Sequence, residues 1–274
     1  MSITITKSPY IVNKEYLDNS IQQHSNHSYF AGNNKITSIF SCRSLAGQEC
    51  FITAGGPSLQ NFDYSRLQGK FTIGINKSFT TYSPNINYSM DSSFFGEMTD
   101  GTMDEVGKER TFTRFLNSPS RKVFLTPLEL KIFSSGDIYL VKRKSNAEIS
   151  VGDLNEGIYP GQNSGFGSIN LAVALGSTKI YLLGYDLCCT DRTHNHSGYK
   201  DCTPDSNGQN TWVARDPKLF NKKLGEFKKE IEDFSPIWKE AGINIINLNP
   251  NSALTCFPFG DIDKVLGEKS ANLS

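Results

Sequence analysis

Seven short apolar runs, separated by polar or helical segments, constrain the fold of this chain most strongly. Each run has the length of a β-strand and is rich in β-branched and aromatic residues. Helical patterns alternate with several of the runs, and this alternation favours a mostly parallel sheet covered on both faces. The sequence therefore predicts an α/β fold, a Rossmann-like three-layer sandwich over residues 46–274 that follows an N-terminal extension over residues 1–45. The seven runs are 50–54, 71–75, 86–90, 122–125, 138–141, 179–183 and 243–247.

Two helices are predicted with identifiable ends. Asn163 or Ser164 can cap the first, and Gly176 can end it. The second spans roughly residues 216–234, where aromatic and aliphatic residues recur at intervals of three and four. Pro236 should break or kink this helix, leaving a short helical piece before Gly242.

A glycine pair follows the first apolar run and precedes a predicted helix start. Gly55 and Gly56 allow positive φ and the close approach of a ligand, and Pro57 with Ser58 suits a first helical turn. Backbone N–H groups left free at a helix start attract anions, phosphate above all. The alternative is a simple tight turn. Because other polar residues are expected beside this stretch, we interpret it as a nucleotide-phosphate loop.

Small and polar residues also follow the other runs. In open α/β sheets, ligands bind beyond the carboxyl ends of the strands, so these positions are expected to meet at one edge. The residues that follow the runs include Asn76, Asp91, Gly184, Asp186 and Asn249. The sequence thus predicts a ligand site at the carboxyl edge of the sheet.

A histidine-containing loop and one aspartate are the candidates for catalysis. His194 and His196 lie a few residues after the run 179–183, and a histidine of ordinary pKa near ~6.5 can deprotonate an acceptor hydroxyl. Arg192 could neutralise a leaving phosphate. Asp91 could orient the acceptor, hold Mg²⁺ or cap a helix. For His194 and His196, the alternative to catalysis is a surface loop with exposed histidines, and the sequence leaves both interpretations open.

No metal site is predicted. The cysteines and histidines of residues 188–202 lack the spacing of a zinc module. Asp261 and Asp263 imitate a metal-binding Asp-X-Asp motif, but their place before an apolar segment favours helix capping.

Composition limits the partners. Lys plus Arg equals Asp plus Glu at 28 each, so a nucleic-acid acceptor is not indicated by charge, although a local basic groove is compatible with it. No run of eighteen apolar residues and no secretory pattern at residues 1–7 is found. Six scattered cysteines suit a reducing compartment, and we expect a cytoplasmic location. The extension is expected to pack on the domain or to form a homo-oligomer contact.

The motifs together resemble a superfamily that contains bacterial sialyltransferases and 6-hydroxymethylpterin diphosphokinase-like (MptE-like) proteins. The similar segments are 54–59, 74–79, 84–91, 164–172 and 179–186, whereas residues 96–121 match nothing in the family. In the sialyltransferase-like branch, the resemblance implies that Gly55, Gly56, Ser58 and Asn76 meet the phosphate and ribose of a CMP-type nucleotide sugar. Ser164 and Gly165 would lie near the nucleotide, and a histidine would be the general base.

Three functions are compatible with these motifs. The first is a transferase with a nucleotide-sugar donor and a hydroxyl-bearing acceptor. The second is an MptE-like pyrophosphokinase, for which the resemblance implies ATP and Mg²⁺ in the same pocket. The third is a nucleotide-binding or assembly module without catalytic activity.

Overall fold

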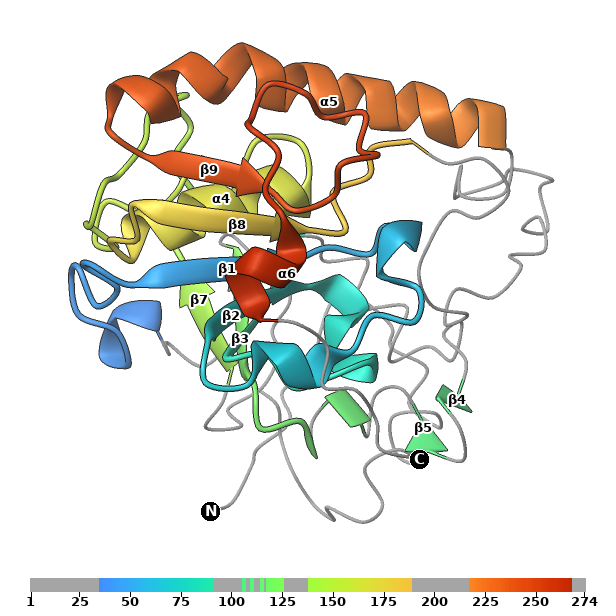
Figure 1. Cartoon of the computed structure of the whole chain (residues 1–274). Coiled ribbons are helices and arrows are strands. Elements are labelled where there is room, and N and C mark those ends of the chain that lie inside the picture. The colour runs from blue at the N-terminus through green and yellow to red at the C-terminus, as the bar shows by residue number, and fades with distance from the viewer. Residues whose placement is uncertain are drawn as a thin grey trace, which may run out of the picture.

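A computed structural model of the chain describes residues 35–90, 105–106, 109–110, 114–115, 117–125, 138–188 and 217–267 (Figure 1). In the sequence order of the described residues, the sheet strands are β1 (Glu49–Thr53), β2 (Phe71–Ile75), β3 (Ile86–Ser89), β6 (Arg121–Leu125), β7 (Ile138–Val141), β8 (Lys179–Leu183) and β9 (Asn244–Asn247). A separate small pair is β4 (Glu105–Val106) and β5 (Glu109–Arg110). The α-helices are α4 (Ser164–Ala174), α5 (Pro217–Glu240) and α6 (Ile262–Leu266). Short 3₁₀-helices are η2 (Ile36–Ser38), η3 (Pro57–Leu59), η4 (Tyr64–Leu67) and η5 (Asn76–Thr80).

The seven strands form one parallel sheet in the order β7-β6-β3-β2-β1-β8-β9. From β1 the chain builds outward to β7, then returns through α4 to β8 on the other side of β1. The strand order therefore reverses between β1 and β8, which is the topological switch point of a doubly wound sheet. The predicted Rossmann-like α/β fold is confirmed.

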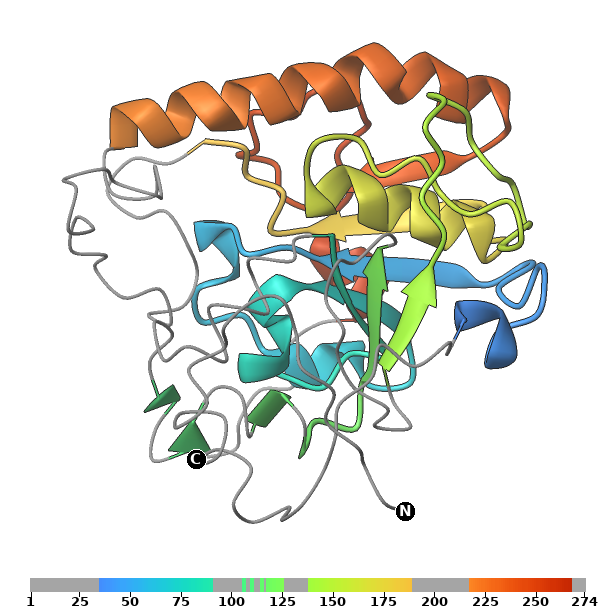
Figure 2. The ribbon, with the colours of Figure 1, turned by 180° about the vertical axis from the view of Figure 1, so that it is seen from behind.

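Helices α4 and α5 cover one face of the sheet. Phe166 of α4 packs against Phe234 and Trp238 of α5, with ring centroids 5.0 and 5.1 Å away respectively. These side chains join alternate sheet residues such as Ile52 and Leu182 in the main buried cluster. Figure 2 shows α4 in front of the strands, with α5 running along the edge that contains β9.

The opposite face is covered by short elements. Leu59 of η3 and Leu67 of η4 are buried against Phe51 and Leu183, and α6 adds partly buried side chains to the same cluster. Figure 1 shows α6 in front of β1 and β2. This layer completes the sandwich with 3₁₀-helices in place of long α-helices.

Residues 35–45 pack against the domain. Ile36 and Leu45 are buried, and the Leu45 N–H donates to the Leu175 carbonyl at 2.8 Å. Lys35 forms a parallel bridge with Leu140 of β7. The boundary at residue 45 and an oligomer contact through the extension stay predictions.

Pro236 was predicted to break or kink the helix, and the break is wrong, because α5 continues through this residue to Glu240. A proline has no N–H to bond the carbonyl four residues earlier. That carbonyl belongs to Glu232, and it accepts a hydrogen bond from the Ser235 hydroxyl at 2.9 Å instead. The side chain thus replaces the missing donor, and the helix carries on.

At α4 the sequence left two candidates for the cap, and the structure selects Asn163. Its side chain accepts from the Phe166 N–H at 2.8 Å, and Gly176 follows the helix with a φ of 98°.

Across the described ranges, no helix combines the length and the apolar character that crossing a membrane requires.

Candidate functional site

The loops that follow β1 and β8 meet at the switch point. The Ala54 N–H donates to the Leu183 carbonyl at 2.8 Å, and the Gly56 N–H donates to the Gly184 carbonyl at 3.0 Å. These bonds extend the pairing of the two strands past their ends. The glycine pair is therefore held beside Gly184, Tyr185 and Asp186, as expected from their positions after the strands.

Gly56 of this loop is required because neighbouring protein atoms approach it closely. Gly56 has a φ of −65°, and neither Gly55 nor Gly56 is among the described glycines with positive φ. A Cβ on Gly56 would lie 1.8 Å from Asp186 Oδ2 and 2.3 Å from the Gly184 carbonyl oxygen. The freedom to adopt positive φ is thus not used here, and the close approach of the β8 loop explains the glycine at position 56. The helix after the loop is the three-residue η3.

Asp186 connects this loop to the segment after β9. Its Oδ1 accepts from the Ser58 N–H at 3.1 Å and from Asn249 Nδ2 at 3.0 Å, and its Oδ2 accepts from Ser58 Oγ at 2.8 Å. Burial raises the pKa of Asp186, while the hydrogen bonds from Ser58 oppose that rise. One carboxylate thus bonds to the segments that follow β1 and β9.

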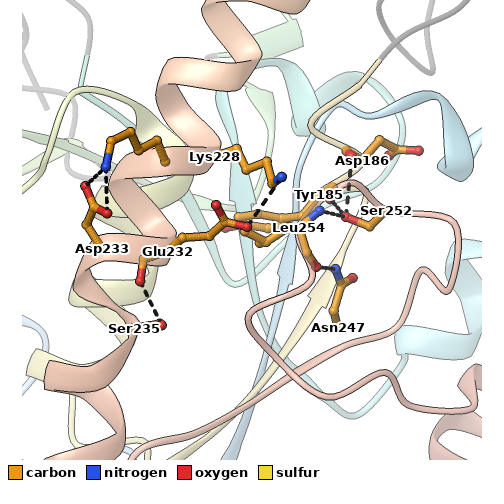
Figure 3. Close-up of polar contacts among 10 residues, drawn as sticks. Tyr185, Asp186, Lys228, Glu232, Asp233, Ser235, Asn247, Ser252 and Leu254 are labelled. Carbon is orange, nitrogen blue, oxygen red and sulfur yellow. Dashed lines mark hydrogen bonds and ion pairs between the residues drawn. The ribbon is translucent and has the colours of Figure 1, made fainter.

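The segment after β9 also bonds to the backbone of the β8 loop. Figure 3 shows Ser252 reaching the carbonyls of Tyr185 and Asp186, and its hydroxyl in turn accepts from the Leu254 N–H at 3.0 Å. The Ala253 N–H donates to the Asp186 carbonyl at 2.8 Å. Asp186 is therefore fixed by both its main chain and its side chain.

A second group of predicted residues gathers at the start of α4. The Ser164 hydroxyl donates to Asn76 Oδ1 at 3.4 Å and accepts from the Met90 N–H at 3.3 Å. Asn87 Nδ2 donates to the Asn76 carbonyl at 2.8 Å. The ends of β2 and β3 are thereby joined to the first turn of α4.

Tyr185 links the two groups, and no specific role was predicted for it from the sequence. Its hydroxyl donates to the Gly165 carbonyl at 3.1 Å and bonds Ser168 Oγ at 2.9 Å. A Cβ on Gly165 would lie 3.2 Å from the Tyr185 ring, so glycine lets the ring approach the helix. The position of Tyr185 after β8 was visible in the sequence, but its hydrogen-bond partners on α4 were not.

Two residues at this edge have left-handed backbone conformations, which Asn tolerates and Leu rarely adopts. Asn76 has a φ of 49° and Leu187 has a φ of 48°. Left-handed conformations are uncommon outside glycine and Asn, and such strain concentrates at functional sites. Among the described residues, backbone strain at this edge is therefore confined to Leu187, in the segment after β8.

The catalytic candidates Asp91, Arg192, His194 and His196 lie outside the described residues. Within the described ranges, no group of three or more His, Cys, Asp or Glu residues could hold a metal ion.

Asp261 caps α6, since its Oδ1 accepts from the Asp263 N–H at 2.9 Å and the Lys264 N–H at 3.3 Å. The helix-capping interpretation of Asp261 is confirmed.

A cavity of about 420 Å³ opens at the amino edge of the sheet, beside the start of β2. Its wall includes Lys70 and the stacked rings of Tyr64 and Tyr82, whose centroids are 4.7 Å apart. None of the predicted site residues lines it. It lies at the opposite end of β2 from Asn76.

No protein-family model matches the chain, and no curated protein matches it. The chain is similar to a solved structure described as the sialyltransferase CstII from Campylobacter jejuni in complex with a substrate analogue, cytidine-5'-monophosphate. The two sequences are 19% identical, the match covers 78% of this chain and 85% of that chain, and the TM-score is 0.36. A likeness of this size carries nothing about the site or its chemistry, so the α/β fold rests on the sheet topology described above.

Proposed function

We propose that the protein is a transferase with a nucleotide-activated donor, and specifically a sialyltransferase-like glycosyltransferase that uses a CMP-type sugar and a hydroxyl acceptor. The observation that carries this proposal is the meeting of the β1 and β8 loops at the switch point, next to the first turn of α4. Nucleotides bind at this position in doubly wound sheets. The motif resemblance in the same segments supports the choice of a cytidine nucleotide.

In this proposal the nucleotide contacts the carboxyl edge. Gly55, Gly56, Pro57 and Asn76 meet the ribose and phosphate, and Ser164 with Gly165 approaches the nucleotide from the start of α4. The α4 N-terminus adds the partial positive charge of its backbone dipoles, which favours a phosphate nearby. His194 or His196 serves as the base for the acceptor hydroxyl, with Arg192 on the leaving phosphate and Asp91 on the acceptor.

A thermal-shift panel tests the donor. We expect CMP to stabilise the protein without Mg²⁺, because a ligand at 100 times its Kd adds about 2.7 kcal/mol of stability. The panel also contains uridine, guanosine and adenosine nucleotides, with and without Mg²⁺. If ATP with Mg²⁺ is the only condition that stabilises the protein, the pyrophosphokinase is favoured. If no cytidine nucleotide binds, the proposed function is abandoned.

A pair of serine variants tests the site. Ser164→Ala removes the hydroxyl that joins Asn76 to Met90, so CMP should bind about tenfold more weakly, as expected for one lost hydrogen bond. Ser177→Ala is the matched control, since Ser177 is also buried but bonds Gln48 and Lys179 beyond the other end of α4. Equal losses of CMP affinity in both variants would place the nucleotide elsewhere.

A further inference from the structure

Three hydrogen bonds to the Asp186 carboxylate come from segments outside its own loop. Two come from Ser58 after β1 and one comes from Asn249 after β9. The strands β1, β8 and β9 are neighbours in the sheet, so the carboxylate joins three adjacent strand ends. Asp186 is 9% exposed, which places these contacts largely away from water.

The same hydrogen bonds occupy groups that a phosphate would need at Ser58. Both the Ser58 N–H and its hydroxyl already bond to Asp186. The carboxylate also fills the space beside Gly56, where a Cβ would lie 1.8 Å from Oδ2. A phosphate at this point would have to displace the carboxylate or face its negative charge, and two close anions disfavour each other.

We propose that Asp186 is a positioning residue that holds the Gly55–Ser58 loop in shape from inside the protein, and that Ser58 does not contact the donor phosphate. The second part rests on the proposed function and departs from the role that the family resemblance implied for Ser58. The first part concerns the protein without any nucleotide. The phosphate then contacts other groups at this edge.

Chemical rescue tests the positioning role without nucleotide. Asp186→Ala leaves a space beside the three donors, and formate carries the carboxylate that is missing. We expect the variant to unfold several degrees below the natural protein, and added formate to restore part of this loss relative to chloride at equal ionic strength. A loss of Tm that formate leaves unchanged would overturn the role.

Asp261→Ala is the matched control, because the Asp261 carboxylate also accepts backbone N–H hydrogen bonds but is half exposed. Formate should not rescue it, and an equal response in both variants would contradict the proposal. If Asp186→Ala does not fold, Asp186→Asn preserves the side-chain size. Its Ser58 amide should exchange hydrogen about tenfold faster than in Asp261→Asn, as expected for weakening a charged hydrogen bond. Unchanged exchange would also overturn the role.

Ser58→Ala tests the second part by comparing CMP with cytidine. If Ser58 contacts no phosphate, the ratio of the Kd for cytidine to the Kd for CMP stays as in the natural protein. Both affinities can still fall because the loop is looser. A Kd ratio that drops in Ser58→Ala would show a direct phosphate contact and overturn this part. Absence of CMP binding to the natural protein refutes the proposed function, while the formate result still decides the positioning role.

Discussion

At the scale of single residues, Gly56 shows how closely the loops after β1 and β8 approach each other. Gly56→Ala would place a methyl group against both the Asp186 side chain and the Gly184 backbone. Because backbone cannot move aside cheaply, we expect the free energy of unfolding to fall by about 1–3 kcal/mol, as in overpacked sites. Urea denaturation measures this loss.

Gly225→Ala is the control for this substitution. Gly225 lies inside α5, and a Cβ there would meet no atom within 4 Å. Alanine should therefore raise the free energy of unfolding by up to about 1 kcal/mol through helix propensity alone. Similar effects from the two variants would mean that the loops are looser than the described contacts indicate.

At the scale of elements, α5 contains a proline whose missing hydrogen bond is supplied by a neighbouring side chain. Ser235→Ala removes the hydroxyl that bonds the Glu232 carbonyl, so it should cost about 0.5–1.5 kcal/mol. Pro236→Ala restores a backbone donor for the same carbonyl and should stabilise the helix. In the Pro236→Ala background, the serine substitution should cost almost nothing.

Urea denaturation of the natural protein, both single variants and the double variant measures this coupling as a double-mutant cycle. Strict additivity would show that Ser235 does not substitute for the missing N–H. Ser235 is half-buried and Pro236 is exposed, so large cavity effects are not expected to obscure the result.

The strands could be predicted closely from the sequence, whereas the contacts at the site could not. Buried parallel strands are continuous apolar runs bounded by turn residues, so β2, β7 and β8 were predicted with the correct bounds. At Pro236 a side-chain hydrogen bond takes the place of the missing backbone one, which helix propensity does not represent. Ser58 and Asp186 are 128 residues apart, so their pairing depends on the fold.

At the scale of the whole molecule, ionisable groups give stability a dependence on pH. Glu49 at the start of β1 bonds Lys179 of β8 with Nζ to Oε1 at 2.7 Å, and the side chains are 40% and 43% exposed. The hydrogen bond from Lys179 lowers the pKa of Glu49, with smaller contributions from Tyr181 and Lys70, whereas burial opposes the shift. A lowered carboxyl pKa stabilises the fold above the unfolded pKa near ~4.3, and this contribution is lost as pH falls through the folded pKa.

Glu49→Gln should therefore be less stable than the natural protein at neutral pH, and the difference should vanish as acid protonates Glu49. The difference should be small and should shrink at high salt, because the pair is exposed. Asp186 and Glu230, whose pKa values burial raises, act with the opposite sign, so comparing the two proteins isolates Glu49. Denaturation from pH 3 to pH 8 provides the test, and a constant difference would refute this role.

The single-residue bridges at the two sides of the sheet have a consequence for association between molecules. Lys35 pairs with Leu140 of β7, and Phe259 pairs with Asn247 of β9, whose N–H and carbonyl both bond the segment around Phe259. An open edge strand is a template for pairing with another chain. With these short segments in place, β7 and β9 offer fewer free backbone groups, which protects the sheet against strand-by-strand aggregation.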